Sequence, residues 1–548
     1  IDSDEDEDDQ DEKSTNLKID WDTLENRIEA LPFGQGGFRD IFVHKDTIYI
    51  VKANVAPNDP NSTRWEDSKY NLLSYSFKEK KMKTLLKDID PSSIKIKEKY
   101  LLVLVEGELR LISLENKPSE GDDYNKKDGW IDLSRIKIKH DPVSEWRQMY
   151  REAWVLQREH FWTPDMSKID WVAIYKKYLP QLELVRTRSD FSDLIWEMQG
   201  ELGTSHAYEF GGDYPNLGEP QPVGSLEARF EYHSRTKSFE IIEIFKGDSW
   251  LQGHDSPLTN AAVSLKIGDH IYAIDGESFN HANSLNMHLE NKANMELSLL
   301  VKRKNKRTKE LVSLVANSQS SNTLYRQWVN KNREYVKKKS NGKLGYVHIP
   351  DMSYKGFSEF WRAYSVEHQC QGLVIDVRYN GGGNVSQLLL KELQQKVLAF
   401  NQSRWFGDGH YPAHSVNGPL VCLTNQHAGS DGDIFSHCFK LLNLGKLIGK
   451  RTWGGVIGIW PRNFLNDFSL TSQPEFSFWF KDVGFDVENY GTEPDIEIDI
   501  TPEDWQNRRD PQLEKGVEVV MKELKTRPPL KPNLSKRPNL KLPKLPKL

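Results

Sequence analysis

Short apolar stretches separated by turn residues dominate the first quarter of the chain, from about residue 20 to residue 135. They predict β-strands, for example at Asp40–Val43, Thr47–Lys52, Tyr100–Val105 and Glu108–Leu114. Strands at this spacing are typical of repeated sheets such as β-propeller blades. One blade takes about 40 to 45 residues, so this stretch holds only two or three blades. We therefore expect the end of a propeller that begins further upstream.

Between about residues 140 and 215 the apolar period changes to that of an α-helix. The first helix has apolar residues three and four positions apart: Trp146, Met149, Tyr150, Ala153 and Trp154. A second helix is expected near Trp171–Tyr178. A third is expected near Phe191–Met198, with Ser189 or Asp190 as its N-cap. The pattern predicts a compact helical domain.

A β-rich unit is expected between about residues 222 and 305. The stretch Ser256–Gly276 resembles a PDZ domain: it predicts a short helix, a Gly-Asp turn, an apolar strand and an Asp-Gly hairpin turn. PDZ domains bind peptides by adding them as a strand at a sheet edge. The unit could instead be a rigid spacer that binds nothing, and the sequence leaves both interpretations open.

From about residue 320 to residue 522, predicted strands and helices alternate. The short apolar runs typical of buried strands are Leu344–Ile349, Leu373–Val377 and Leu420–Thr424. Helical patterns follow the last two, at Val385–Leu398 and Asp433–Leu442. This alternation predicts an α/β layered domain. The chain as a whole is then a multidomain α+β protein.

The 548 residues include 74 lysines and arginines against 80 aspartates and glutamates, a net charge of −6. That balance disfavours a dedicated nucleic-acid-binding protein. No apolar run approaches the roughly 18 to 20 residues that a membrane span needs. The three cysteines, Cys370, Cys422 and Cys438, form no CxxC pair, so neither a disulfide framework nor a Cys-rich zinc site is expected. We expect both ends to be disordered: the acidic residues 1–19, and the Lys/Pro-rich residues 525–548.

Two Gly-rich turns lie between a predicted strand and the helix after it. In Ala428–Asp433, Ser430 stands where a helix N-terminus presents free N–H groups, so this serine could attack a carbonyl group. An N-cap serine is the simpler interpretation. In Asn380–Asn384, three glycines would let a substrate backbone approach closely. A plain tight turn and a phosphate cradle remain alternatives, although neither GxGxxG nor GxxxxGK[ST] is present.

A serine nucleophile needs a base, and two further segments carry suitable side chains. His206 lies in the polar segment Leu202–Tyr208, just after a predicted helix end. Histidine titrates near neutral pH and is the usual general base. Glu488 lies in Val487–Asp495 and could orient a partner, as the carboxylate of a catalytic triad does. A structural histidine and a charged surface turn are the alternatives.

Together these segments resemble the tricorn protease family of serine peptidases. The motifs that carry the resemblance occur in the family's order: Glu201–Tyr208, Asp376–Gly383, Gly429–Asp433 and Glu488–Gly491. The resemblance covers about residues 20 to 520. It implies the C-terminal half of the family layout: the end of a second propeller, a mixed helical domain, a PDZ domain and an α/β domain of the kind found in crotonase and the tail-specific proteases.

The resemblance also implies site residues. It makes Ser430 the nucleophile and His206 the general base, with Ser205 and Glu488 as a relay behind the histidine. The oxyanion donors would be the backbone N–H groups of Asp431 and of the glycine turn. The implied substrate-backbone contacts are Gly381, Gly382, Gly383 (also the second oxyanion donor), Val456, Ile457 and Gly458. No cofactor or metal is implied. Peptides are the implied substrates, a homohexamer the implied assembly, and the cytoplasm the expected location.

The tail-specific and C-terminal processing proteases form a sister group that uses a Ser–Lys dyad. Their lysine lies in a Thr-Phe-Gly-Lys-Gly-like segment, and Gly455 occupies that place in Thr452–Val456. Glycine cannot accept a proton, so this departure favours the histidine-based mechanism. The alternatives are a Ser–Lys enzyme, a catalytically inactive PDZ scaffold that binds peptides, and a nucleic-acid contact through the Lys/Pro-rich tail.

Overall fold

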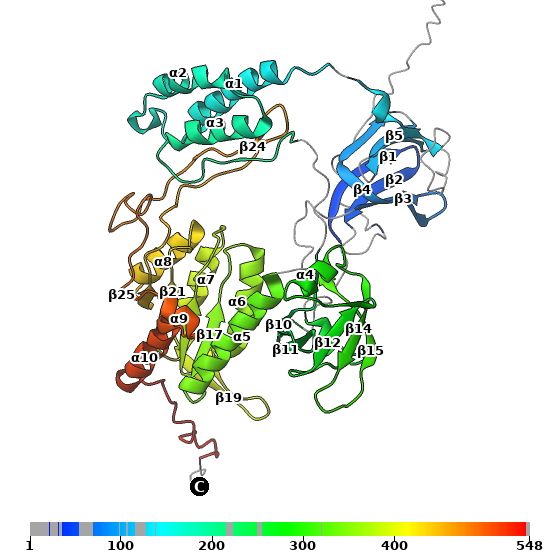
Figure 1. Cartoon of the computed structure of the whole chain (residues 1–548). Helices are drawn as coiled ribbons and strands as arrows, with labels where there is room; N and C mark the ends of the chain where they lie inside the picture. The colour runs from blue at the N-terminus through cyan, green and yellow to red at the C-terminus, as the bar shows by residue number, and fades with distance from the viewer. Residues whose placement is uncertain are drawn as a thin grey trace, which may run out of the picture. The chain divides into compact units, whose positions relative to one another are not determined.

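The computed structural model describes residues 21, 31, 36–53, 70–97, 99–105, 108–114, 128–137, 139–214, 223–248, 255–318 and 321–543. The predicted acidic segment 1–19 lies outside these residues. The chain divides into two units, Ile1–His140 and Asp141–Leu548, and each is described by itself (Figure 1).

Seven strands of the N-terminal unit form one antiparallel sheet in which each strand pairs with the next. They are β1 Phe38–His44, β2 Thr47–Ala53, β3 Tyr70–Ser76, β4 Lys81–Lys97, β5 Tyr100–Val105, β6 Glu108–Ser113 and β7 Trp130–Ile131. The four strands given as examples from the sequence are present. The register shifts within β4, between Asp90 and Lys95. Over the described residues the sheet does not close on itself, so a propeller is not established.

Three helices open the second unit: α1 Pro142–His160, α2 Trp171–Leu182 and α3 Arg188–Gly200. The N-cap predicted for α3 was wrong. Thr187 is the cap: its side chain accepts a hydrogen bond from the Asp190 N–H, and the Asp190 carboxylate accepts one from the Thr187 N–H. The helix begins at Arg188, before the first residue of its apolar pattern. Arg188 is buried but charged, so a pattern of hydrophobic residues does not include it.

A small three-stranded sheet ties this helical layer to a segment far along the chain. β8 Glu209–Phe210 pairs with β24 Leu470–Thr471, which pairs with β23 Asn463–Phe464. In Figure 1 the orange segment around β24 lies against the teal helices. Buried Arg188 adds ion pairs to Glu209 and, at 2.6 Å, to Asp467. The loop between α3 and β8 is therefore fixed by the pairing of β8 with β24 and by the ion pairs of Arg188.

The PDZ-like unit is a six-stranded sheet with the path β10-β11-β12-β14-β15 and β13 paired to β12. Its elements are β10 Ala228–His233, β11 Ser238–Ile244, the 3-10 turn η5 Pro257–Thr259, β12 His270–Ile274, β13 Glu277–Ser278, α4 Ser284–Leu289, β14 Glu296–Lys302 and β15 Glu310–Val315, flanked by the pair β9 Gly224–Ser225 and β16 Asn317–Ser318. The sheet continues past the expected boundary at residue 305. In β15 the apolar side chain of Leu311 is 72% exposed. Hydrophobic and polar residues therefore do not alternate with burial in this strand, and the sequence pattern did not predict it.

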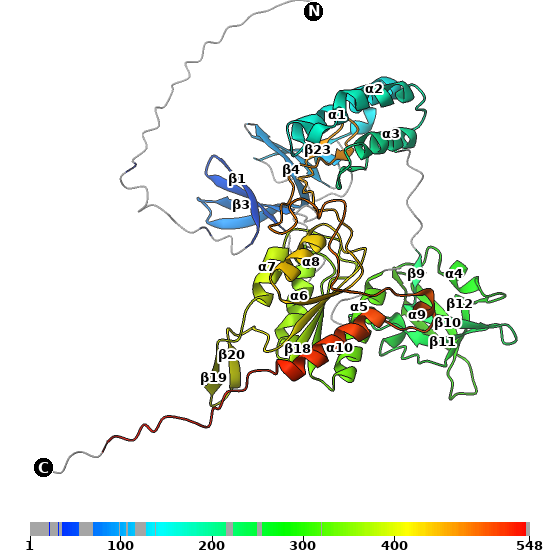
Figure 2. The same cartoon turned by 90° about the vertical axis from the view of Figure 1, so that its left-hand side faces the viewer.

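The last layer is a parallel sheet in the order β17-β18-β21-β22-β25. Its strands are β17 Leu344–His348, β18 Gly372–Asp376, β21 Leu420–Thr424, β22 Gly445–Gly449 and β25 Ile496–Glu497. One face is covered by α5 Ser321–Lys339 and α10 Pro511–Thr526, which lie along each other in Figure 2. The other face is covered by α6 Tyr354–Glu367, α7 Ser386–Leu393 and α8 Asp431–Leu441. The predicted α/β layering is present.

Three smaller features complete this layer. A hairpin, β19 Ala399–Ser403 with β20 Gly407–Tyr411, follows α7, and α9 Pro502–Gln506 precedes α10. Helix α7 ends five residues before the predicted Leu398, which is 75% exposed and so does not continue the buried stripe. The prediction of a disordered tail from Lys525 was wrong at its start, because α10 extends to Thr526 and includes Lys525. Beyond the helix, Leu530 exchanges two backbone-to-side-chain hydrogen bonds with Asn417, at 2.8 and 2.9 Å.

Candidate active site

Ser430 lies at the turn from β21 into α8, at the carboxyl edge of the parallel sheet. Its backbone has φ +56° and ψ −122°, which is rare for a residue with a side chain. It is the residue before the first turn of α8, yet its side chain makes no capping bond. The turn is fixed from behind, because the Gly429 N–H donates to the Asn380 carbonyl at 3.0 Å. A strained, uncapped serine at a helix N-terminus is free to react rather than to stabilise the helix.

His206 reaches Ser430 across 224 positions of sequence. Its Nε2 lies 3.1 Å from the Ser430 Oγ. Ser472, next to β24, fixes the histidine backbone: its hydroxyl donates to the His206 carbonyl at 2.6 Å and accepts from the Tyr208 N–H at 2.9 Å. The small sheet β8–β24 is therefore what brings the imidazole to the serine. Sequence reasoning missed Ser472, since nothing in its local sequence marks this contact.

A relay of hydrogen bonds continues behind the imidazole. His206 Nδ1 lies 2.8 Å from the Ser205 Oγ, and that hydroxyl donates to the Glu488 carboxylate at 3.1 Å. The Glu488 carboxylate also accepts three backbone N–H bonds, from Ser205 at 2.6 Å, Val456 at 2.6 Å and Ile457 at 3.0 Å. Four donors therefore hold this carboxylate in place. The relay ends on a carboxylate whose position is fixed.

Aromatic side chains surround the imidazole. The ring of Trp453 meets His206 edge-on at 5.4 Å between centroids, and Tyr208 lies 5.6 Å away. Burial lowers the pKa of His206, and the negative charge of Glu488 opposes that shift. At neutral pH the imidazole is therefore mainly uncharged, as a general base must be. The sequence did not predict that the rings of Trp453 and Tyr208 contact the imidazole, although both residues lie in or beside the motifs described above.

Two backbone N–H groups beside Ser430 have no acceptor within the described part of the chain. They belong to Asp431, the first residue of α8, and to Gly383. The Asp431 carboxylate accepts from the Ser386 N–H at 2.9 Å and from its hydroxyl at 2.5 Å, both at the start of α7. These two bonds connect the start of α7, which follows the glycine turn, to the first residue of α8. They therefore fix the positions of the two N–H groups relative to each other.

The middle glycine of this turn lies against Ser430. A Cβ atom added to Gly382 would lie 2.5 Å from the Ser430 Cβ and 3.0 Å from its Oγ, and its φ is +83°. Gly383 also has positive φ, and its added Cβ would collide with the Met352 carbonyl at 2.0 Å. Around Gly381 nothing lies within 4 Å. Gly381 thus faces open space, Gly382 faces the Ser430 side chain, and Gly383 faces a backbone carbonyl.

The segment expected to contact a substrate backbone lies next to the relay, but its donors are in use. The N–H groups of Val456 and Ile457 donate to Glu488. Gly458 pairs with Phe476 in both directions, its own N–H donating at 2.7 Å. The carbonyls of Val456 and Ile457 accept no hydrogen bond from the described residues. Contacts with a peptide through this segment would have to use these two carbonyl groups.

Asp433 is a site residue to which the sequence analysis gave no role, although it stands in a motif that carried the resemblance. It is fully buried in α8 and accepts N–H bonds from Gly454 at 2.8 Å and Gly455 at 3.2 Å. Burial raises its pKa to about 6, against these hydrogen bonds. Asp433 therefore holds the loop that places Trp453 against the His206 imidazole.

Replacing Asp433 with asparagine should remove one component of the pH dependence of stability. Because the folded-state pKa lies above the unfolded value of 3.8, the unfolded chain loses this proton first and stability falls as pH rises. Relative to Asp433→Asn, the wild type should lose about 3 kcal/mol of unfolding free energy between about pH 4 and pH 6. Urea unfolding of both proteins across that range measures it. Parallel curves for the two proteins would contradict this assignment.

Two other features are absent from the residues that the structure describes. Among them, no helix is both long and apolar enough to cross a bilayer. Within the same ranges, no group of three or more His, Cys, Asp or Glu side chains could hold a metal ion.

Three protein-family models match this chain. "Peptidase family S41" matches residues 343–498, "Tricorn protease C1 domain" residues 142–200, and "Tricorn protease PDZ domain" residues 224–317. The first spans the turns that carry Ser430 and Gly381–Gly383, and the second ends six residues before His206.

Curated relatives carry related names. A "Tricorn-like protease C-terminal subunit" of Sulfurisphaera tokodaii is 41% identical over 94% of this chain and 59% of its own length. A "Tricorn protease homolog" of Saccharolobus solfataricus is 45% identical over 81% of this chain and 41% of its own length. A "Tricorn protease" of Thermoplasma volcanium is 37% identical over 92% and 48% respectively. The chain thus spans about half the length of the relatives it matches.

A solved structure has the same fold. The match to "Crystal structure of the tricorn protease" has a TM-score of 0.80 and 35% sequence identity, and covers 89% of this chain and 46% of that one. The mixed α/β multidomain architecture, with its PDZ and S41 parts, is therefore shared.

Proposed function

This chain belongs to the tricorn protease family, and we propose that it is a serine endopeptidase that hydrolyses oligopeptides through an acyl-enzyme. One observation carries the proposal: His206 Nε2 lies 3.1 Å from the Ser430 Oγ, with Ser205 and Glu488 aligned behind the imidazole. A nucleophile, a base and a group that orients the base are what acyl transfer needs. The distance between Nε2 and Oγ is within hydrogen-bonding range.

In the proposed reaction the Ser430 Oγ attacks the carbonyl carbon of the scissile bond while His206 Nε2 takes the hydroxyl proton. The electron pair of the carbonyl bond moves to oxygen. When that bond re-forms, the C–N bond breaks and the leaving amine takes the proton from Nε2. Water then repeats the sequence on the ester and releases Ser430. Nε2 must begin without a proton, so Nδ1 carries one and donates to Ser205.

The negative oxygen of the tetrahedral intermediate would be bound by the N–H groups of Asp431 and Gly383. Their lack of acceptors supports this role, as does the Asp431–Ser386 link that fixes them relative to each other. Gly381 and Gly382 leave room for a peptide backbone, and the carbonyls of Val456 and Ile457, with Gly458 beyond them, would align it. Losing one such oxyanion donor typically costs about 100- to 1,000-fold in rate.

A fluorophosphonate probe tests the proposal, because it forms a covalent bond only with an activated serine. The intact chain should be labelled, Ser430→Ala should not, and a mixed peptide library should yield cleavage products that mass spectrometry identifies. Labelling that persists in Ser430→Ala, or none in the intact chain, would leave the inactive PDZ scaffold as the better interpretation. A Ser–Lys mechanism is disfavoured because Gly455 donates its N–H to Asp433 and has no side chain.

The pH dependence of kcat/KM should report the relay. Activity should fall as the pH drops through the pKa of His206, below the ordinary histidine value of 6.5. Glu488→Gln removes the charge that raises this pKa, so the acid limb should move to lower pH. The rate should also fall, by less than the about 10,000-fold that a directly bonded carboxylate is worth, because Ser205 lies between. If the acid limb of the kcat/KM profile does not shift in Glu488→Gln, and this variant melts at the wild-type temperature, the result would contradict the proposed relay.

Three wider properties belong to the same proposal. The sheet β1–β7 would be the end of a β-propeller. The domain bounds would be those predicted from the sequence, except that the PDZ-like unit extends to β16 Asn317–Ser318. The protein would act in the cytoplasm as a homohexamer. Light scattering on the purified chain measures the number of subunits. A monomer at all concentrations would overturn the proposed hexamer and leave the proposed peptidase mechanism unaffected.

A further inference from the structure

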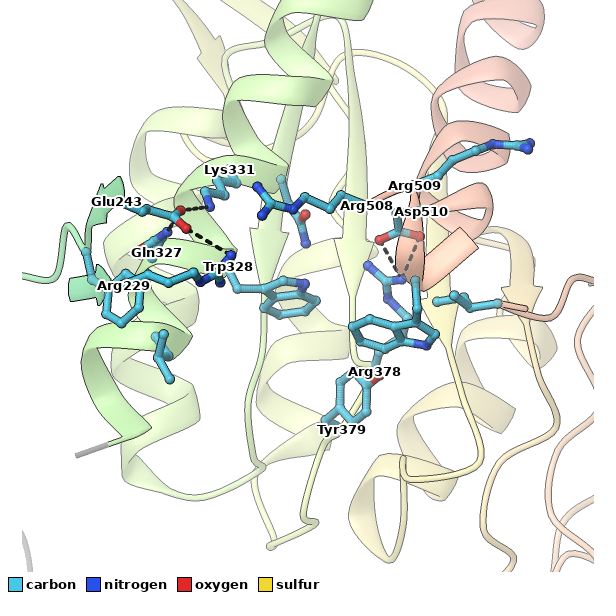
Figure 3. Close-up of a pocket in the computed structure, with 15 residues that line it drawn as sticks. Arg229, Glu243, Gln327, Trp328, Lys331, Arg378, Tyr379, Arg508, Arg509 and Asp510 are labelled. Atoms are coloured by element: carbon cyan, nitrogen blue, oxygen red, sulfur yellow. Dashed lines mark hydrogen bonds and ion pairs between the residues drawn. The ribbon is translucent and has the colours of Figure 1, made fainter. Parts of the chain in front are cut away.

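A concave site separate from the Ser430 cluster lies on the opposite face of the parallel sheet from α7 and α8. It is a pocket of about 560 Å³ between the PDZ-like unit, α5 and the segment around α9 (Figure 3). Glu243 of β11 joins its two walls, accepting from Gln327 and Lys331 of α5 at 2.7 Å each. The pocket is therefore built into the contact between the PDZ-like unit and the α/β layer.

The charges that line this pocket are mainly positive. Five of its lining residues are arginine or lysine and two are acidic. Arg229 and Lys331 share the single carboxylate of Glu243, at 3.4 and 2.7 Å. Arg508 has no ionic partner among the described residues, and in Figure 3 its guanidinium points toward the side of the pocket where Lys331 lies. An anion bound there would meet under-compensated cations from both walls.

Aromatic side chains give the pocket a second property. Trp505 is 66% exposed and Tyr379 is 48% exposed, although both line a concavity. Trp328 of α5 meets Tyr379 edge-on at 6.2 Å between ring centroids, and the buried Arg378 guanidinium lies 5.5 Å from the Trp328 ring. Exposed aromatic faces beside cations suit a ligand that carries both carboxylates and an apolar or aromatic side chain.

The pocket is close to the catalytic turn along the chain. Tyr379 lines it, and Gly381–Gly383 begin two residues later at the same edge of the sheet. Arg378 is anchored to Asp376 and to Asp510 at 2.7 and 2.9 Å, so this edge is rigid. The pocket and the glycine turn are thus connected by two residues of a fixed backbone segment.

We propose that this pocket is an exosite that binds an acidic, aromatic-containing segment of the substrate peptide. The proposal rests on the peptidase function, and it adds a preference for anionic peptides at a distance from the cleaved bond. The carboxylates would contact Arg508, Arg229 and Lys331, and the apolar side chain would lie against Trp505.

Binding is measured without turnover by using the Ser430→Ala chain. The probe is a fluorescein-labelled decapeptide with three glutamates around one phenylalanine, and its partner has three glutamines instead. By fluorescence anisotropy the acidic probe should bind more tightly, and Arg508→Glu and Trp505→Ala should each weaken it by about tenfold or more. High salt should weaken it as well. Arg307→Glu, an equal charge change in the exposed β14–β15 loop, should have no effect.

The outcomes separate this proposal from the peptidase proposal. Equal binding of the two peptides, or an equal loss in Arg307→Glu and Arg508→Glu, would overturn the exosite even if the intact chain reacts with fluorophosphonate. Tight binding of the acidic probe without such labelling would support the pocket and overturn the peptidase. In the active chain, Arg508→Glu should raise KM for the acidic peptide and leave kcat unchanged.

The acidic residues 1–19 of this chain are another possible source of carboxylates for the pocket. Deleting residues 1–19 from the Ser430→Ala chain should leave the affinity for the probe unchanged. A tighter affinity after deletion would show that this segment occupies the pocket, and it would overturn the assignment to substrate.

Discussion

Replacing His206 with alanine should lower kcat/KM on the order of a million-fold, the loss typical of a triad base. Without Nε2 at 3.1 Å, the Ser430 hydroxyl keeps its proton and is a poor nucleophile. Ser430→Ala should cost about as much, and the double variant no more than either single one, because the two groups act as a unit. Steady-state assays on one peptide substrate measure all three.

The informative control is a second buried histidine, close by but without access to the serine. His437 lies in α8, with Nδ1 3.2 Å from Thr492 Oγ1 and Nε2 3.1 Å from Asp482. It has a hydroxyl and a carboxylate partner, as a catalytic histidine does. His437→Ala should lower the melting temperature and keep most of the activity per folded molecule, whereas His206→Ala should do the reverse. The opposite result would make His206 the structural residue.

The elements of this fold were predictable where pattern and burial agree. Leu420–Thr424 is an unbroken apolar run, and the strand occupies those residues with every side chain buried. Prediction failed where a polar residue takes an apolar place. Arg188 is buried in the first turn of α3 by two carboxylates that lie 21 and 279 residues away. The apolar pattern therefore predicts a helix start that is too late.

The site was less predictable than the fold, because its parts meet only through long-range contacts. No local pattern indicates that His206 lies beside Ser430: the contact depends on β8, β24 and Ser472, and the resemblance alone suggested it. The resemblance was also silent on Asp433 and on the hydrogen bonds that occupy the N–H groups of Val456 and Ile457. Such roles follow from which donors face which acceptors, and a linear sequence does not contain that information.

Gly382→Ala should lower the rate of fluorophosphonate labelling by at least about a hundredfold. The new methyl group would lie 2.5 Å from the Ser430 Cβ, and φ +83° disfavours any side chain. Ser430 must then move, and a displacement of about 1 Å is enough to cost about a hundredfold in rate. The turn cannot yield easily, since Asn380 accepts the Gly382 N–H at 2.9 Å and is itself buried.

Gly381→Ala is the matched control for this prediction, because it adds the same methyl group one residue earlier. Nothing lies within 4 Å of the position it would take, and the Gly381 N–H bond to the Pro350 carbonyl at 3.2 Å can remain. Labelling by the small probe should stay within a few-fold of wild type, since the probe needs the nucleophile and not a long peptide. Equal losses in the two variants would mean that the turn tolerates no side chain for reasons of folding, and that its contact with Ser430 is not what requires Gly382. A large loss in Gly382→Ala alone, with an unchanged melting temperature, would establish that this glycine is required to leave space for the nucleophile.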